Sequence, residues 1–325
     1  MIDASIVIPA YNASKTISKT IEACLAQDHG MDKLEIIVVD DGSADNTKEI
    51  VQRYPVKYIY QDKSGPARAR NRGWLTAGGE TIFFTDSDCI PEKSWVLKTL
   101  SDYTSEDIGA VGGSYGIANP ESLLADCVYQ EIVYRHAKMP KKAKALGSYN
   151  LSVRRKALEE VGGYDERYRM ASGEDNDLSY KILEKGYYLI FDKDIKVLHY
   201  HPTGLIRYLK SQAWHGFWRV KLYMDHPAMA KGDDYSSVID YIQPSLSLAI
   251  LGLIPTVFYA PARALLLFLL TLEALLQLPF AIVISKDKKD ARYFFLAVVT
   301  FLRGFSRGIG MAGGILNFMI LRGRR

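Results

Sequence analysis

The chain has 325 residues and a formal net charge of +4 at pH 7, a length that allows one large or two modest domains. The charge is uneven: residues 245–325 hold ten Lys and Arg against three Asp and Glu, or +7, which leaves −3 for residues 1–244. A mildly acidic first part argues against nucleic-acid binding, and a basic, apolar last part favours a membrane with anionic headgroups. Three scattered cysteines, Cys24, Cys89 and Cys127, are too few for a disulfide framework or a zinc site, and we expect buried thiols in a reducing compartment.

Short apolar strands alternate with helical segments through the first two hundred residues. We expect strands at 5–9, 34–40, 56–61 and 81–85, and helices at 15–27, 47–53 and 66–77. Such alternation with short connections predicts an α/β fold with a largely parallel sheet and helices on both faces.

The pattern continues less regularly after residue 88. We expect a helix over 93–102, a strand near 110–115, a helix over 120–137, an extended segment at 146–153, a turn at 162–165, a helix starting at 173–175, and strands at 187–191 and 195–200. The basic segment 138–144 has no hydrophobic period, which predicts a solvated loop. A mobile lid or a contact with lipid phosphates is the alternative.

Two of these strands run directly into carboxylate pairs, Asp40-Asp41 and Asp86-Ser87-Asp88. In an open α/β sheet, ligands bind in the crevice beyond the carboxyl ends of the strands, so both pairs are expected in one cleft. Four carboxylates there need a cation or hydrogen-bond donors to offset their charge. We expect a hard divalent metal ion, bound by oxygen ligands and shared with the phosphates of a nucleotide.

Six short motifs stand out in this part of the chain. They are Ser5-Ile6-Val7-Ile8-Pro9-Ala10-Tyr11-Asn12, Val38-Val39-Asp40-Asp41-Gly42-Ser43, Ala69-Arg70-Asn71, Asp86-Ser87-Asp88, Gly162-Gly163-Tyr164-Asp165 and Gly173-Glu174-Asp175. In order and approximate spacing they resemble the motifs of family 2 glycosyltransferases of the GT-A fold, over roughly residues 5–201. The resemblance implies a GT-A (Rossmann-like), mostly parallel sheet with flanking helices in a catalytic domain over 1–203. It also implies a nucleotide-diphosphate sugar of UDP or GDP type as donor, and Mn²⁺ or Mg²⁺ as cofactor.

The resemblance assigns roles to the acids and their neighbours. Asp88 is expected to bind the metal directly, with Asp86 nearer the ribose or a metal-bound water. His199 is expected to complete the metal site, although a histidine there can also cap or pack. Asp40 and Asp41 are expected to contact the base and ribose, with a helix cap and turn as the alternative. The donor site is further expected to include Pro9, Tyr11, Asn12, Arg70, Asn71, Ser87 and Gly163.

An acceptor hydroxyl needs a general base near its proton, because its own pKa lies far above neutral. By analogy with the family's acidic pair at this place, we expect Asp175, preceded by Glu174, to be that base. The helix N-terminus is expected to keep Asp175 ionised. Direct attack opposite the leaving group would invert the anomeric carbon. A structural Asp175, with Asp177 as the helix-capping acid, is the alternative.

Residues 204–240 are expected to form an amphipathic helical segment at the bilayer surface, because two tryptophans and four basic residues interleave along 205–223. An ordinary core helix is the alternative. Processive polysaccharide synthases of the family carry Gln-x-x-Arg-Trp near this place, and this sequence does not match that motif. Candidate contacts to the acceptor or pyrophosphate are Asn150, His215, Trp218 and Arg219.

Residues 241–325 are expected to form a membrane domain. The stretch 264–285 reaches roughly 33 Å at ~1.5 Å per residue, enough for a ~30 Å hydrocarbon core. Glu273 lies inside this stretch and should face another helix. Together with 241–260 it is expected to form a transmembrane hairpin, 241–285, that turns around 261–263.

Basic residues set the expected orientation of this domain. The loop 286–292 and the end 322–325 are both basic, hence both cytosolic under the positive-inside rule. Residues 293–321 contain Arg303 and Arg307, and this helix is expected to lie along or re-enter the membrane. The two arginines would then lie near lipid or acceptor phosphates, or snorkel at the interface.

These patterns together predict a membrane-bound, metal-dependent, inverting glycosyltransferase. Its catalytic domain is expected on the cytosolic face of the cytoplasmic membrane, because Met1 leads into a strand without a basic n-region. Membrane segments favour a lipid-linked, polyprenyl-type saccharide as acceptor and membrane lipids as partners. Transfer onto polyprenyl phosphate and, less so, polysaccharide synthesis are the alternatives.

Two other classes fit the sequence less well. A nucleotidyltransferase would carry a glycine-rich basic loop after the first strand, and Pro9-Ala10-Tyr11-Asn12 is not one. A non-catalytic membrane scaffold that only binds a sugar nucleotide is opposed by the candidates present at every catalytic position.

Overall fold

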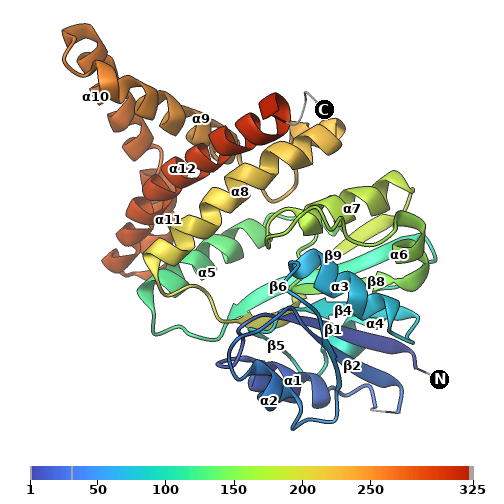
Figure 1. Ribbon diagram of the computed structural model, residues 1–325. Helices are drawn as coiled ribbons and strands as arrows, with labels where there is room; N and C mark the ends of the chain where they lie inside the picture. Colours follow the sequence, from blue (N-terminus) through green and yellow to red (C-terminus); the bar gives the residue numbers. More distant parts are fainter. Residues whose placement is uncertain (1, 31, 322–325) are drawn as a thin grey trace. The chain divides into compact units, whose positions relative to one another are not determined.

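The computed structural model describes residues 2–30 and 32–321 (Figure 1). The chain divides into two compact units. The first unit comprises Met1–Ala118, Ile132–Tyr200 and Asp233–Tyr235, and the second comprises Asn119–Glu131, His201–Gly232 and Ser236–Arg325. The division after Tyr200 lies close to the predicted boundary at 203. The helix α5 (Leu123–His136) belongs to both units: its residues up to Glu131 are part of the second unit, and those from Ile132 are part of the first. No change of composition in the sequence marks this boundary.

The first unit is built on a nine-stranded mixed sheet. Its strands are β1 (Ala4–Ala10), β2 (Leu34–Asp40), β3 (Lys57–Tyr60), β4 (Thr81–Thr85), β5 (Cys89–Pro91), β6 (Ile108–Ile117), β7 (Lys142–Ala143), β8 (Asn150–Arg154) and β9 (Tyr188–His199). Their order is β3-β2-β1-β4-β8-β6-β9-β5, with β7 also paired to β9. β1, β2, β3 and β4 are mutually parallel, and so are β6 and β9, whereas β5, β7 and β8 pair antiparallel. The predicted α/β fold is confirmed.

Helices cover both faces of this sheet (Figure 1). On one face pack α1 (Ile17–Leu25), α2 (Thr47–Val51) and α4 (Trp95–Ser101), and on the other α3 (Pro66–Leu75), α6 (Arg155–Val161) and α7 (Glu174–Glu184). Side chains alternate along β1, so that Ile6 and Ile8 join the first cluster and Val7 the second. Because both faces are covered, the central strands are continuous apolar runs. Polar side chains therefore gather at the strand ends.

The structure differs from the predicted elements at four places. β5 and α6 were not predicted, because three and seven residues are too short to show a period. The two strands expected at 187–191 and 195–200 are one strand, β9, whose pairing with β6 shifts register between Gly113 and Ser114. The basic segment 138–144 includes the short strand β7, so it is not a loop throughout.

The second unit is helical. Its longer helices are α8 (Leu205–Asp225), α9 (Val238–Leu253), α10 (Ala260–Leu275), α11 (Leu278–Lys288) and α12 (Phe295–Gly314), and Ile315–Leu321 continue α12 as a π-helix. α8 and α12 lie side by side (Figure 1), and glycines permit this close approach. A Cβ atom at Gly310 would overlap the carbonyl oxygen of Ala213, and one at Gly216 would overlap that of Arg307.

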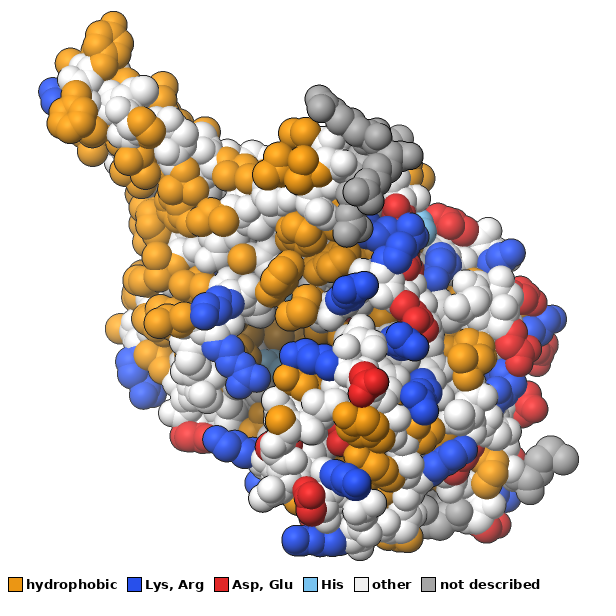
Figure 2. Space-filling model, viewed as in Figure 1, with side chains coloured by type: hydrophobic (Ala, Val, Ile, Leu, Met, Phe, Trp, Pro, Cys, Tyr) orange, Lys and Arg blue, Asp and Glu red, His pale blue; other side chains and the backbone are white. Residues whose placement is uncertain are grey.

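Three helical stretches of this unit are long and apolar enough to cross a membrane: Val238–Thr256, Ala260–Lys288 and Ala291–Leu321. Their outward side chains are largely apolar, as the orange surface over α9 and α10 in Figure 2 shows; Phe268 of α10, for example, is 62% exposed. An exposed apolar surface of this extent fits membrane segments. The sequence had predicted two crossings, and the third stretch meets the same criteria of length and composition.

The hairpin between α9 and α10 turns earlier than predicted. Pro261 lies in the first turn of α10, where its missing N–H removes no intrahelical hydrogen bond, so the turn precedes Ala260. Glu273 of α10 is fully buried and accepts a hydrogen bond of 3.2 Å from the hydroxyl of Ser247 on α9. The prediction that Glu273 faces another helix is confirmed.

The two arginines of α12 have protein partners. Arg303 is buried and donates to Glu131 at 2.6 Å, and Arg307 donates to Asp240 at 2.9 Å. The expectation that these side chains meet lipid or acceptor phosphates, or snorkel, is therefore wrong, because carboxylates of the same unit bind both guanidinium groups. The basic end at 322–325 lies outside the described residues.

Candidate active site

The carboxylates at the end of β2 are held by hydrogen-bond donors of the protein. Asp40 accepts from the backbone N–H of Ser43 and from the hydroxyl of Tyr58, both at 2.8 Å. Asp41 accepts from Gln61 at 2.7 Å and from two backbone N–H groups of the loop after β3 at 2.8 Å. Both acids are nearly fully buried. These donors offset the charge of Asp40 and Asp41, and contact with a base or ribose stays a prediction.

The acids after β4 point to different partners. Asp86 accepts from Arg70 Nη2 at 2.7 Å, and Nη1 of the same guanidinium donates to Glu174 at 2.9 Å. Arg70 and Glu174 are almost completely buried, whereas Asp86 is about one-third exposed. Arg70 was predicted as a donor contact. In the structure Arg70 links α3 to the acids of two other elements, and its contact with a donor stays a prediction.

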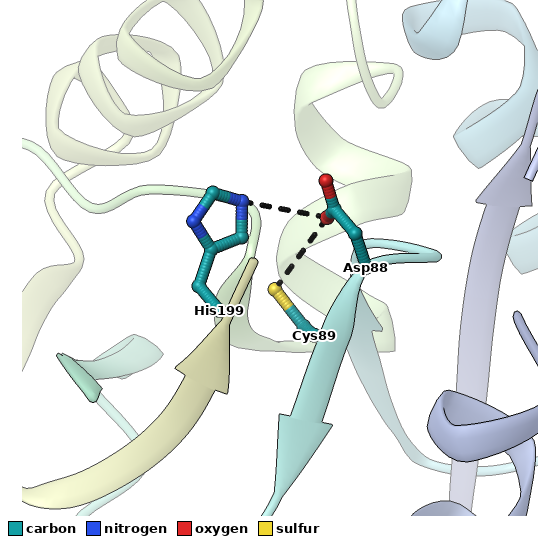
Figure 3. Close-up of side chains that lie close together, drawn as sticks. All are labelled: Asp88, Cys89 and His199. Carbon is teal, nitrogen blue, oxygen red and sulfur yellow. Dashed lines mark hydrogen bonds and ion pairs between the residues drawn. The ribbon is translucent and has the colours of Figure 1, made fainter. Parts of the chain in front are cut away.

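Asp88 lies beside His199 and Cys89, as Figure 3 shows. Asp88 Oδ1 is 3.4 Å from His199 Nε2 and 4.0 Å from Cys89 Sγ. The register of the sheet brings these groups together, because Cys89 of β5 and His199 of β9 are directly opposite each other. Side chains of opposite residues in an antiparallel pair lie on the same face. The distant His199 was predicted, and Cys89 was not.

The donors of this cluster fit a divalent cation. A carboxylate oxygen and an imidazole nitrogen 3.4 Å apart can share one ion, since both bond lengths are about 2.1 Å. Burial alone would lower the pKa of His199, but the charges of Asp88 and Asp86 raise it above its ordinary value. An electron-rich position of this kind attracts protons or metal ions. Asp88 and His199 would therefore hold the metal.

Two acids begin α7, and the structure separates them. Glu174 is buried against Arg70, and burial together with the charge of Asp175 raises the pKa of Glu174 to about 7. The Asp175 side chain is partly exposed and accepts from the N–H of Asn176 at 2.9 Å. Burial nevertheless raises the pKa of Asp175 above its ordinary value. Desolvation of Asp175 therefore outweighs the backbone donors that favour its ionised form, and its role as the base stays a prediction.

The loop after β1 meets the loop after β2. Asn12 has a positive φ of 49° and its side-chain oxygen accepts from the N–H of Ala44 at 2.8 Å, while its own N–H donates to Ser43 at 2.9 Å. Tyr11 is 43% exposed, with the Lys63 ammonium group 3.9 Å above its ring. A half-exposed ring at the carboxyl ends of the strands can stack on a base. Donor contacts of Pro9, Tyr11, Asn12 and Ser87 stay predictions.

Three predicted contact residues serve the fold. The Asn71 amide donates to Tyr164 O at 2.9 Å, and its oxygen accepts from the N–H of Tyr164 at 2.8 Å. Gly163 packs against Asn71, and a Cβ atom there would lie 2.6 Å from the Asn71 oxygen. Asn150 is buried and donates to the carbonyls of Ser114 and Ile195, both at 3.0 Å. Protein groups use the amides of Asn71 and Asn150, and the expected contacts of these residues with donor and acceptor stay predictions.

The remaining predicted contacts lie on α8 in the second unit. Trp218 is buried with its ring centroid 5.3 Å from that of Phe217, so it packs in the manner of a core residue. Burial and nearby arginines lower the pKa of His215 to about 3, so His215 is neutral near pH 7 and brings no charge to a pyrophosphate. Arg219 lies 5.6 Å from the ring of Tyr223. Contacts of these residues with an acceptor stay predictions.

The fold is of the GT-A type that glycosyltransferases use. Residues 5–162 match the family described as Glycosyl transferase family 2. Glycosyltransferase AglE of Haloferax volcanii is 29% identical over 228 residues, which are 68% of this chain and 74% of AglE. The pre-mycofactocin glycosyltransferase of Mycobacterium tuberculosis is 27% identical over 69% of this chain, which spans only 48% of that protein.

A solved structure extends the likeness to nearly the whole fold. The mannosyltransferase PcManGT from Pyrobaculum calidifontis, in complex with GDP-Man and Mn²⁺, has a TM-score of 0.61 and 20% sequence identity. The match covers 95% of this chain and 86% of PcManGT. The likeness concerns the arrangement of helices and strands, and it includes residues outside the family 2 region.

Proposed function

We propose that the protein is a membrane-bound, metal-dependent, inverting glycosyltransferase. It would move a sugar from a nucleotide-diphosphate sugar of UDP or GDP type to a lipid-linked saccharide at the cytosolic face of the cytoplasmic membrane. The observation that carries the proposal is that the acids of the first unit differ in their partners and in their exposure. Asp88 pairs with His199, Asp86 with Arg70, and Asp175 stands partly exposed at the start of α7.

The donor half of the proposal rests on Asp88 and His199. Bound Mn²⁺ or Mg²⁺ would stabilise the negative charge that develops on the departing nucleoside diphosphate. The carboxylate and imidazole would hold the ion, while Asp86, fixed by Arg70, keeps an open edge for the ribose or a metal-bound water. GDP-Man and Mn²⁺ in the structurally similar PcManGT support this choice of ligands.

The acceptor half rests on Asp175. Its carboxylate would accept the proton of the acceptor hydroxyl while that oxygen attacks the anomeric carbon opposite the leaving group, which inverts the configuration. A raised pKa makes a carboxylate a stronger base, and Asp175 is in that sense better suited to the task than an unperturbed aspartate. Glu174, buried on Arg70, would set the position of the α7 start and contact no substrate.

The lipid-linked acceptor is supported by the second unit. Three stretches with exposed apolar side chains would hold the enzyme at a bilayer, which a soluble acceptor would not require. The basic loop at 286–292 favours its location on the cytosolic side. Transfer onto polyprenyl phosphate itself is the alternative within this class, and the same membrane segments favour it equally.

A single assay tests the proposal. Purified full chain in detergent is incubated with separate UDP- and GDP-sugars, a membrane lipid extract and Mn²⁺ or Mg²⁺, and both nucleotide release and labelled lipid are measured. We expect labelled lipid with one sugar nucleotide, lost in chelator and in Asp88→Asn. Full transfer in chelator would contradict the metal mechanism, and transfer to soluble sugars alone would contradict the lipid-linked acceptor.

A further inference from the structure

A thiol lies beside the two side chains that would hold the metal. Cys89 Sγ is 4.0 Å from Asp88 Oδ1, and the donor atoms of Asp88, Cys89 and His199 all lie within 4.8 Å of one another (Figure 3). Glycosyl transfer through Mn²⁺ or Mg²⁺ makes no use of sulfur, because these ions prefer oxygen ligands. Sugar transfer by the proposed mechanism therefore assigns no role to the thiol of Cys89.

The position of Cys89 is fixed by the sheet. It stands directly opposite His199 in the pairing of β5 with β9, and Tyr200 N–H donates to Asp88 O at 3.1 Å in the adjacent pair. This places Cys89 and His199 in a non-hydrogen-bonded pair, in which side chains of an antiparallel ladder come closest. Cys89 is fully buried, so its orientation is held by packing and not by solvent.

The spacing suits an ion that binds sulfur. Bonds from Zn²⁺ to sulfur, nitrogen and oxygen are about 2.3, 2.1 and 2.0 Å, so two donors of one ion lie at most about 4.4 Å apart. The separations of 3.4 Å for Asp88 with His199 and 4.0 Å for Asp88 with Cys89 lie below this limit, and Cys89 and His199 lie within 4.8 Å of each other, so these side chains need to move by at most a few tenths of an ångström to share one ion. One carboxylate, one imidazole and one thiolate form a mixed donor set typical of Zn²⁺ and its heavier analogue Cd²⁺.

We propose that Cys89 is a third metal ligand, used by thiophilic dications, so that Zn²⁺ or Cd²⁺ binds the nucleotide-free enzyme and displaces Mn²⁺ or Mg²⁺. The bond that forms joins sulfur to the ion, and the thiol proton leaves to solvent. An ion with three protein ligands stays bound after the nucleotide departs, which would make these metals inhibitors. This inference takes its site from the proposed function and adds the class of metal that the site selects.

The first experiment uses full-length protein in detergent without nucleotide. Cd²⁺ is titrated while the sulfur-to-cadmium charge-transfer absorbance in the ultraviolet and the released protons are recorded. We expect one equivalent of Cd²⁺ to produce the band, and Cys89→Ser to abolish it and to weaken Cd²⁺ binding at least about tenfold. The matched control is Cys24→Ala, which removes another fully buried thiol, on α1, and should leave the band unchanged.

The outcomes separate this inference from the proposed function. Cadmium bound to wild-type protein without a sulfur band, or a band that persists in Cys89→Ser, would overturn the role of Cys89. These readings need no sugar transfer, and the wild-type titration decides even if Cys89→Ser fails to fold. A band in wild type combined with chelator-insensitive transfer would retain the thiophilic site and contradict the metal mechanism. Mn²⁺-dependent transfer without a sulfur-to-cadmium band would support the metal mechanism and contradict the thiophilic site.

Discussion

Substitution of Glu174 by glutamine gives a pH-dependent change in stability whose sign and size follow from the structure. Glu174 is buried against Arg70 and the charge of Asp175, and its pKa in the folded protein is about 7, against 4.5 ordinarily. Between these two values the folded state binds more protons than the unfolded state. Stability is therefore highest at low pH and falls as the pH rises from about 4.5 to 7. Glutamine cannot ionise, so Glu174→Gln escapes this loss.

The magnitude follows from the pKa difference. A shift from 4.5 to about 7 corresponds to roughly 3 kcal/mol at ~1.36 kcal/mol per pKa unit, to which the neighbouring Asp175 contributes part. The quantity to compare is the unfolding free energy of Glu174→Gln minus that of wild type. We expect this difference to be larger at pH 8 than at pH 4.5, by up to about 3 kcal/mol. Glutamine keeps an oxygen for the guanidinium of Arg70, so the hydrogen bond itself survives.

The assay is denaturant unfolding of the full chain in detergent at several pH values, followed by tryptophan fluorescence. Trp74 and Trp95 are buried in the first unit and report its unfolding. Glu159→Gln is the matched control, since Glu159 is exposed on α6. A stability difference between Glu174→Gln and wild type that does not change with pH, or that grows toward acid, would refute the reasoning about this buried carboxyl.

Further predictions concern folding and the packing of the second unit. Arg70→Met should destabilise the first unit by about 3–5 kcal/mol in the same unfolding assay, because it leaves Asp86 and Glu174 without their cation; a loss below about 1 kcal/mol would contradict this. Gly310→Ala should lower the thermal midpoint of the full chain, because its Cβ atom overlaps a backbone oxygen of α8. Gly313→Ala, whose Cβ atom meets only Phe217 at 3.6 Å, should be neutral or stabilise by up to ~1 kcal/mol, and equal effects of the two alanines would contradict this packing.

Patterns that repeat along the chain could be predicted from the sequence. The strands β1, β2 and β4 are apolar runs, and β2 and β4 lead directly into acids, so both the sheet and the location of the carboxylates followed from local order. β5 could not be predicted, because three residues become a strand only when β9 pairs with them. The same pairing places Cys89 opposite His199, in the candidate site. It is an example of a site residue whose only signal is tertiary.

Charge pairs between distant segments also escaped prediction. Arg70 and Glu174 are 104 positions apart, and nothing in either local sequence indicates that a buried guanidinium joins Asp86 to the start of α7. The sequence predicted that the acids need a cation or hydrogen-bond donors; in the structure, neutral donors bind Asp40 and Asp41, and the guanidinium of Arg70 binds Asp86. Likewise, Arg303 and Arg307 lie in an apolar stretch of the sequence, and this position alone indicated contacts with phosphates. In the structure Arg303 pairs with Glu131, which is distant in the sequence.

The rate of sugar transfer by Asp175→Asn tests the central claim most directly. Transfer is measured with the sugar nucleotide and lipid fraction that wild type uses, while binding of the same nucleotide with Mn²⁺ is measured by calorimetry; Asp194→Asn, at an exposed position of β9, is the control. We expect Asp175→Asn to transfer sugar about 10²–10⁴-fold more slowly than wild type, with its affinity for the sugar nucleotide nearly unchanged. Transfer within a few-fold of wild type would contradict the assignment of Asp175 as the base.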